Sequence, residues 1–177
     1  FTGSLLIGHA TTGTLDAATY NTGVGLTALD ALTTGDYNTA LGYGAGSSLT
    51  TGGQSVLIGT NAGDAITTSQ YNIGVGYNAL GAISTSANGN VAIGHSAMKD
   101  STAAGYNIAI GGNALEDTTG SYNIGIGTQA GDNITSGYGN IVIGYNVDVG
   151  SATTNRQLLI VGNDASTTTT WISGDNS

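Results

Sequence analysis

The hexapeptide YNIGVG, residues 71–76, returns with small changes as YNIAIG at residues 106–111 and as YNIGIG at residues 122–127. Looser versions of the same run occur along the rest of the 177-residue chain. Self-similarity at a fixed period is the sequence signature of a repeat architecture. The chain is therefore predicted to build one small structural unit many times over.

A glycine closes each of these apolar runs and marks the period. Successive marker glycines lie 16 to 18 residues apart, and most lie 17 apart. Ten markers separated by nine nearly equal steps predict about ten rungs of a stacked array. The marker glycines are Gly8, Gly25, Gly42, Gly59, Gly76, Gly94, Gly111, Gly127, Gly144 and Gly162.

The residues around each marker fall into columns. A large apolar residue stands one place before the glycine, and a small residue usually stands two places before it. A polar residue stands four places before it, as in Asn21, Asn38, Ser55, Asn72, Asn90, Asn107, Asn123 and Asn140. Large-small-large alternation has a period of two and indicates a short strand. The many Gly and Thr residues of each unit disfavour helix.

A second apolar column follows about seven places after the marker, and it predicts a second short strand in each rung. Its members are Leu32, Leu49, Ile66, Ile83 and Ile134. The predicted fold class is all-β, a parallel β-roll or β-solenoid of about ten 17-residue rungs. Residues 1–165 form one repeat array, and residues 166–177 are expected to lead from it toward a further region.

Stacking in register places like residues over like, about 4.8 Å apart. Asparagine over asparagine is then expected to form amide ladders, and tyrosine over tyrosine to stack. Tyr20, Tyr37, Tyr71, Tyr106 and Tyr122 each precede the polar column and are expected to pack across rungs. A glycine at a fixed place after a strand predicts either a positive φ or a backbone pressed against a neighbouring chain.

The composition excludes several functional classes. The chain has 31 Gly, no Pro, no Cys and a formal net charge of −9. Such a charge repels a phosphate backbone, so nucleic-acid binding is not expected. No apolar run reaches the roughly 20 residues that a membrane-spanning helix needs, so membrane insertion is not expected. The abundant Ile, Val and Leu and the absence of Pro argue against disorder.

The repeat resembles two known kinds of array. The runs NVAIGHSA at residues 90–97 and NIAIGGNA at residues 107–114 resemble the repeat of trimeric autotransporter adhesin heads. The stretch YNTALGYGAGSSLTTG at residues 37–52 is still more similar to repeat arrays of bacteriophage tail fibres. The period of 17 is longer than that of the adhesin heads, which makes the fibre the closer comparison.

The resemblance covers nearly the whole chain and carries several implications. It implies a left-handed parallel β-roll, a homotrimer of three chains side by side in a fibre, and a location outside a cell or on a virion surface. It implies attachment to surfaces, with a host cell-surface glycan or protein as the partner. We expect this array to be mainly shaft, and adhesion by the repeat surface itself is the alternative within this class.

Several residues are candidate surface contacts. Tyr43, Tyr77 and Tyr145 each follow a marker glycine, a place that His9 and His95 take in other rungs. Trp171 lies outside the repeat pattern. These aromatic residues could touch a partner, whereas the marker glycines and the asparagines are expected to be structural.

The sequence indicates no catalytic, cofactor-binding or metal-binding residues, so an enzyme is not expected. Asp30, Asp64, Glu116 and Asp132 stand five places after a marker. They predict a solvated acidic face, although Glu116 and Asp132 on neighbouring rungs could share a cation. Glycine-rich stretches that mimic phosphate loops are ordinary members of the repeat.

Two other functions are alternatives to the fibre. Paired threonines, as at residues 33–34 and 50–51, could order water in an ice-binding solenoid or another extracellular filament. However, a flat ice-binding array needs alternate rather than adjacent threonines on one strand face. A polysaccharide-degrading fibre would need paired carboxylates in a groove.

Overall fold

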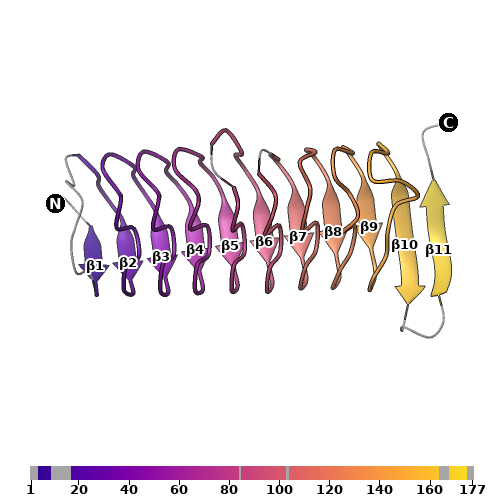
Figure 1. Ribbon diagram of the computed structural model, residues 1–177, viewed down its shortest axis with the longest axis horizontal. Coiled ribbons are helices and arrows are strands. Elements are labelled where there is room, and N and C mark those ends of the chain that lie inside the picture. The colour runs from indigo at the N-terminus through magenta and orange to yellow at the C-terminus, as the bar shows by residue number, and fades with distance from the viewer. Residues whose placement is uncertain (1–3, 9–16, 84, 103, 164–167, 175–177) are drawn as a thin grey trace.

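The computed structural model describes residues 4–8, 17–83, 85–102, 104–163 and 168–174. These residues form an eleven-stranded sheet whose strand order follows the chain order (Figure 1). The strands are β1 (Leu5–Ile7), β2 (Thr22–Val24), β3 (Thr39–Leu41), β4 (Val56–Ile58), β5 (Ile73–Val75), β6 (Val91–Ile93), β7 (Ile108–Ile110), β8 (Ile124–Ile126), β9 (Ile141–Ile143), β10 (Leu158–Asn163) and β11 (Thr168–Gly174). The prediction of an all-β parallel solenoid is confirmed, and the described residues contain no helix.

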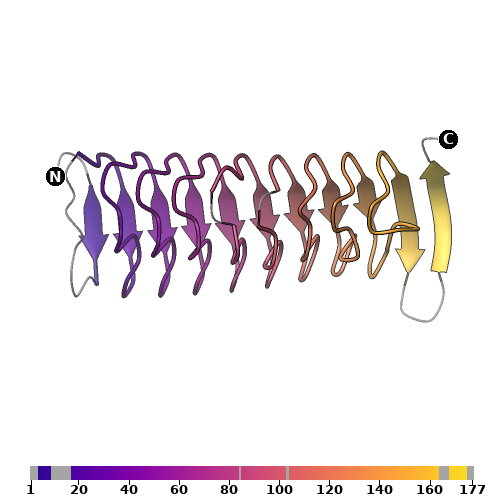
Figure 2. The same cartoon turned by 45° about the horizontal axis from the view of Figure 1, so that its top comes forward.

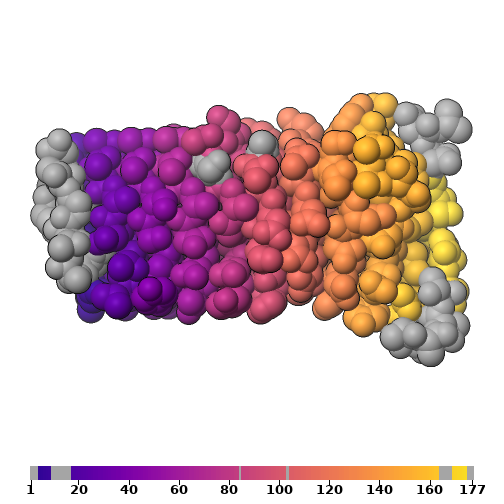
Figure 3. All heavy atoms as spheres, in the orientation of Figure 1, coloured from indigo at the N-terminus to yellow at the C-terminus, as the bar shows by residue number. Residues whose placement is uncertain are grey.

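Strands β1 to β10 pair in parallel and in register, one strand per rung. For example, Ala92 of β6 lies beside Ala109 of β7, and Ala109 lies beside Gly125 of β8. The ten strands form one wall of the solenoid, and turns form the rest of each rung (Figure 2). The result is an elongated body with the first strand, β1, and the last strand, β11, near opposite ends of its long axis (Figure 3).

The prediction of a second strand in each rung is wrong. The residues about seven places after the marker lie in turns, where the backbone N–H of Leu49 donates to the carbonyl of Gly46 at 3.0 Å. The residues two and four places after the marker have left-handed backbone, with φ of 52° at Asn78 and 60° at Leu80. Left-handed residues turn the chain away from the extended direction of a strand. A backbone N–H that donates to the carbonyl three residues before it cannot also donate to a neighbouring strand.

We call the side of the solenoid that these turns form, from the marker glycine to about seven residues after it, the turn wall. Backbone hydrogen bonds nevertheless join successive rungs along it. The N–H of Leu29 donates to the carbonyl of Ala45 at 3.1 Å, and the N–H of Gly46 donates to the carbonyl of Ala62 at 2.9 Å. The turn wall therefore satisfies its buried backbone groups between rungs, as the sheet does, without having strand geometry.

The middle residue of each short strand points into the solenoid. From β2 to β9 these buried residues are Gly23, Ala40, Leu57, Gly74, Ala92, Ala109, Gly125 and Val142. Leucine and isoleucine side chains from the turn wall fill the remaining space, and Leu29, Leu49, Ile66 and Leu115 are all fully or almost fully buried. Small strand residues therefore make room for large turn residues in one continuous core.

The rung that contains Leu57 shows how closely the sizes are matched. Leu57 is the largest middle-strand residue from β2 to β9, and glycines face it from the turn wall. A Cβ at Gly63 would lie 2.7 Å from Leu57 Cδ2, and a Cβ at Gly46 would lie 2.9 Å from Leu57 Cδ1. Both distances are too short for a real side chain, so the glycines accommodate Leu57.

The C-terminal end departs from the repeat. Strand β10 pairs with β9 so that Leu158 lies beside Ile141 and Ile160 beside Ile143, which places Val161 where earlier rungs have the marker glycine. The assignment of Gly162 as the tenth marker is therefore wrong by one residue. Gly162 instead lies within β10, which pairs antiparallel with β11.

Candidate interaction surfaces

The outer face of the sheet is a continuous apolar surface. The first and third residues of the short strands point away from the core, and from β4 to β10 they are all Val, Ile or Leu. Ile93 is 39% exposed and Ile110 is 38% exposed. We call this surface the sheet face; its members from β4 to β10 are Val56, Ile58, Ile73, Val75, Val91, Ile93, Ile108, Ile110, Ile124, Ile126, Ile141, Ile143, Leu158 and Ile160.

The asparagine column forms a buried ladder rather than a contact surface. The backbone N–H of Asn107 donates to Asn90 Oδ1 at 3.0 Å, and the N–H of Asn123 donates to Asn107 Oδ1 at 2.7 Å. Every amide nitrogen of the column except that of Asn72 also donates across the rung, as where Asn107 Nδ2 donates to the carbonyl of Gly120 at 3.0 Å. The expected amide ladder is confirmed, and it is buried along its length.

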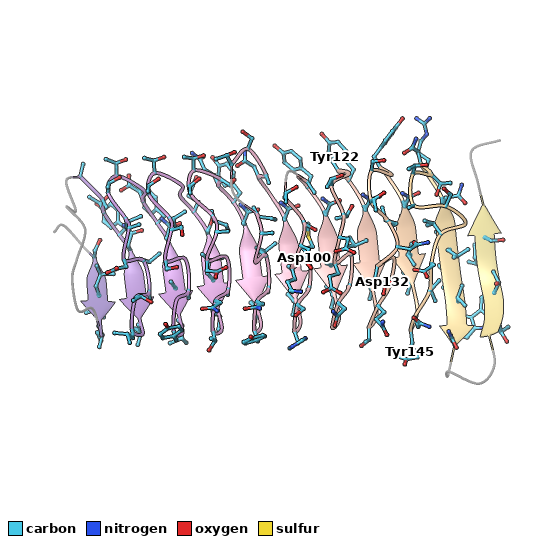
Figure 4. The ribbon with its side chains drawn as sticks, in the orientation of Figure 1. Asp100, Tyr122, Asp132 and Tyr145 are labelled. Carbon is cyan, nitrogen blue, oxygen red and sulfur yellow. The ribbon has the colours of Figure 1, made fainter. Side chains whose placement is uncertain are left out.

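Two tyrosine rows run along opposite edges of the solenoid. Tyr122 belongs to the row that precedes the asparagine column, and Tyr145 belongs to the row that follows the marker glycines (Figure 4). In the first row, Tyr20 stacks on Tyr37 with ring centroids 5.1 Å apart, and Tyr106 stacks on Tyr122 at 5.5 Å. The cross-rung packing expected of this row is therefore seen in two pairs.

The second row holds three of the candidate surface contacts. Tyr43, Tyr77 and Tyr145 are 55%, 50% and 43% exposed, and Tyr77 stacks on His95 at 5.4 Å. His9 of the same row lies outside the described residues. This row borders the sheet face, because each member follows directly on the marker glycine that ends a strand.

Trp171 lies on β11 and is 70% exposed. Its ring covers Gly162, where a Cβ would lie 2.9 Å from Trp171 Cζ2. Gly162 therefore leaves room for the indole ring rather than forming part of the repeat. The neighbouring Ile172 lies beside Ile160 in the register of β10 and β11, so the hairpin extends the sheet.

Acidic side chains lie on the turns of the C-terminal half, among them Asp100 and Asp132 (Figure 4). Burial, followed by the hydrogen bond and negative charge of Asp148, raises the pKa of Asp132 to about 6, and Glu116 adds to the shift. Lys99 lies 3.1 Å from Asp100 and 3.5 Å from Glu116. Among the described residues, no group of three His, Cys, Asp or Glu side chains could hold a metal ion.

The raised pKa of Asp132 predicts that this site stabilises the fold more in acid than at neutral pH. The folded protein favours the protonated carboxyl, so the contribution to the free energy of unfolding is full below pH 4 and falls as the pH rises toward 6. Asp132→Asn should therefore raise the melting temperature at pH 7 and have little effect at pH 4. Asp117→Asn, at an exposed acid in the rung before, is the control. Equal shifts for Asp132→Asn at both pH values would contradict the prediction.

A shallow hollow interrupts the first tyrosine row. It has a volume of about 240 Å³ and is lined by Thr34, Asp36, Tyr37, Thr51, Gly53, Gln54 and Gln70. Gln54 stands in the row where Tyr37 and Tyr71 stand in the flanking rungs, and Gly53 has no side chain to fill the place before it. Of these residues, the sequence singled out Tyr37 and the paired threonines Thr34 and Thr51, but not Asp36, Gly53, Gln54 or Gln70. The break in the column at Gly53 and Gln54 was the signal that could have located the site.

The threonine pairs present only one exposed row. Thr34, Thr51 and Thr68 are exposed, whereas their neighbours Thr33 and Thr50 are half-buried. Thr33 Oγ1 donates to the carbonyl of Thr50 at 3.1 Å, so its hydroxyl is engaged between rungs. A single row does not make the flat two-row lattice on which the ice-binding alternative depends.

The comparisons with known proteins add no family. No protein-family model matches the chain, and neither a curated protein nor a solved structure matches it. The described part of the chain holds no helix with the length and apolarity needed to cross a membrane.

Proposed function

We propose that the chain is a structural and adhesive fibre module that assembles side by side with two further copies and supports attachment to a cell surface outside the cell or on a virion. The observation that carries the proposal is the sheet face, an apolar surface that repeats at every rung from β4 to β10. Seven strands at about 4.8 Å and three residues at about 3.3 Å give it an area of roughly 330 Å². Apolar patches of this size on soluble proteins commonly mark contacts with a partner.

The partner that fits the sheet face best is a second copy of the same chain. The face repeats its side chains at every rung, so only a partner with the same spacing can match it along its full length. A stable interface buries about 800 Å² per partner, which is more than the sheet face alone supplies. The bordering row of Tyr43, Tyr77 and Tyr145 therefore takes part in the contact, and a trimer gives each chain two neighbours.

The assembly predicts a specific effect of charge on the sheet face. Ile110→Lys places an ammonium group at the centre of the face, so it should convert the trimer to a monomer at micromolar concentration. The far-UV circular dichroism should stay unchanged, because residue 110 points away from the core. Sedimentation velocity measures the change. Thr119→Lys, which adds the same charge at an exposed turn residue, is the control.

Two results would count against the fibre module. A wild-type chain that remains a monomer throughout the micromolar range would overturn the assembly. Attachment is tested with fluorescently labelled wild-type protein and Ile110→Lys on candidate host cells. Avidity of three linked chains predicts much stronger retention of the wild type, and equal retention would contradict a role for assembly in attachment.

A further inference from the structure

The hollow at Gly53 and Gln54 lies where the first tyrosine row is interrupted. Three other described rungs also lack the tyrosine of this row, because Gly89, Gly139 and Arg156 stand there. At Gly89 the ring of Tyr106 occupies the space, with Cδ1 2.7 Å from where a Cβ would lie. At Gly139 the side chain of Arg156 lies 3.4 Å from the corresponding position.

The hollow also breaks a second pattern in the same rung. The residue before each member of the tyrosine row commonly binds the rung before it through its side chain. Asp36 Oδ1 accepts from the backbone N–H of Thr19 at 2.7 Å, and Asn88 Oδ1 accepts from the N–H of Gln70 at 2.7 Å. Gly53 has no side chain that could accept a hydrogen bond from the backbone N–H of Asp36 in the same way. The same rung thus lacks both side chains that would fill the surface.

The walls of the hollow combine an aromatic face with planar polar groups. Tyr37 is 57% exposed, and its stacking partner Tyr20 belongs to the rung before it, so the ring face toward the rung of Gln54 has no stacked tyrosine. The amide side chains of Gln54 and Gln70 are exposed beside it. Asp36 uses Oδ1 for both of its bonds to Thr19, which leaves Oδ2 for a ligand.

We infer that this hollow binds one neutral pyranose unit of a surface glycan, with a C–H face of the sugar against Tyr37. This inference rests on the proposed attachment role and names the class of partner. Hydroxyl groups both donate and accept, and the amides of Gln54 and Gln70 offer both functions, while Asp36 accepts. The carboxylate of Asp36 disfavours anionic sugars. The volume of about 240 Å³ lies below that of pockets for drug-sized ligands, which suits a single sugar unit.

The alternative ligand is an organic cation, since a tyrosine face beside a carboxylate also attracts a quaternary ammonium group. The amide donors of Gln54 and Gln70 are of no use to such a cation. The sugar is therefore favoured, and tetramethylammonium serves as the competing probe.

The test is a binding measurement by saturation-transfer difference NMR on the wild-type protein. The probes are the methyl glycosides of glucose, galactose, mannose and N-acetylglucosamine, with tetramethylammonium chloride as the cationic probe. We expect at least one glycoside to bind in the millimolar range. Binding of no glycoside, or tighter binding of tetramethylammonium than of every glycoside, would overturn the inference.

Three variants locate the binding. Tyr37→Gln keeps a residue type that the chain already tolerates in this row at φ 58°, and it should weaken binding at least about tenfold. Tyr122→Gln removes a stacked tyrosine of the same row away from the hollow and should leave binding unchanged. Gln54→Tyr continues the row through the hollow and should abolish binding while the fold is retained. Equal binding by the wild type and Gln54→Tyr would place the sugar elsewhere and contradict the inference.

Sedimentation velocity on the same samples separates this site from the proposed assembly. The hollow lies in the first tyrosine row, at one edge of the solenoid, whereas the contact proposed above uses the sheet face and the second row at the opposite edge. Tyr37→Gln and Gln54→Tyr should therefore keep the wild-type oligomer. Loss of sugar binding with an intact trimer supports the site, and a monomeric wild type that still binds sugar would contradict the fibre assembly alone.

Discussion

Replacing Gly111 by Val should lower the free energy of unfolding by about 2–6 kcal/mol. Gly111 has a φ of 136°, in a region that side-chain-bearing residues rarely adopt, and such strain costs about 1–3 kcal/mol. A Cβ there would also overlap the carbonyl group of Gly127 in the next rung. Because that carbonyl belongs to the backbone, the clash adds about 1–3 kcal/mol of overpacking.

Thermal unfolding followed by circular dichroism measures this effect. A loss of 3 kcal/mol should lower the melting temperature by roughly 6–12 °C in a domain of this size. Gly112→Ala is the matched control, because a Cβ at the very next residue would meet its nearest atom at 3.7 Å, an ordinary contact. If Gly111→Val had the same melting temperature as Gly112→Ala, the stacked glycines would not be structural.

The marker glycines were expected to have positive φ or to press against a neighbouring chain. The structure shows positive φ, and the close contact is with the next rung of the same chain. The glycine column therefore sets the rung spacing within one chain. Its effect on stability does not depend on assembly, so the Gly111→Val result should be the same in the Ile110→Lys background.

Replacing Asn107 by Ala should lower the free energy of unfolding by about 2–6 kcal/mol. The change removes the acceptor of the Asn123 N–H and the donor to the carbonyl of Gly120, and both groups are buried. Each buried polar group left without a partner costs about 1–3 kcal/mol. Urea unfolding measures the loss, and Thr128→Ala at an exposed position is the control.

The one serine in the ladder provides the converse experiment. Ser55 Oγ accepts the Asn72 N–H at 3.2 Å, but Asn72 Nδ2 is buried without a hydrogen-bond partner. Ser55→Asn would supply a side-chain oxygen of the kind that serves the other rungs, so it should raise the free energy of unfolding by about 1 kcal/mol. If Asn107→Ala were neutral and Ser55→Asn destabilising, the ladder would not be the source of stability.

The sequence alone determined the period, the short strand before each glycine and the asparagine ladder. Because the rungs stack in register, residues that recur at the same place in each repeat lie above one another in the structure. The alternation around Ala109 and Ile110 showed two faces, one small and one large, for the same reason. A local sequence pattern is enough to predict these features, because each rung contacts only the rungs next to it.

Only the tertiary structure decided which face is buried. The small face points inward because Leu115 and its equivalents on the turn wall already fill the core, which leaves Ile110 on the outside. The turn wall was wrongly predicted to be a strand. The left-handed positions of Asn113 and Leu115 are held by different residue types in different rungs, so the sequence does not reveal the left-handed backbone. The hollow was missed because it arises where two neighbouring columns, at Gly53 and Gln54, depart from their pattern in the same rung, and reading one column at a time does not reveal it.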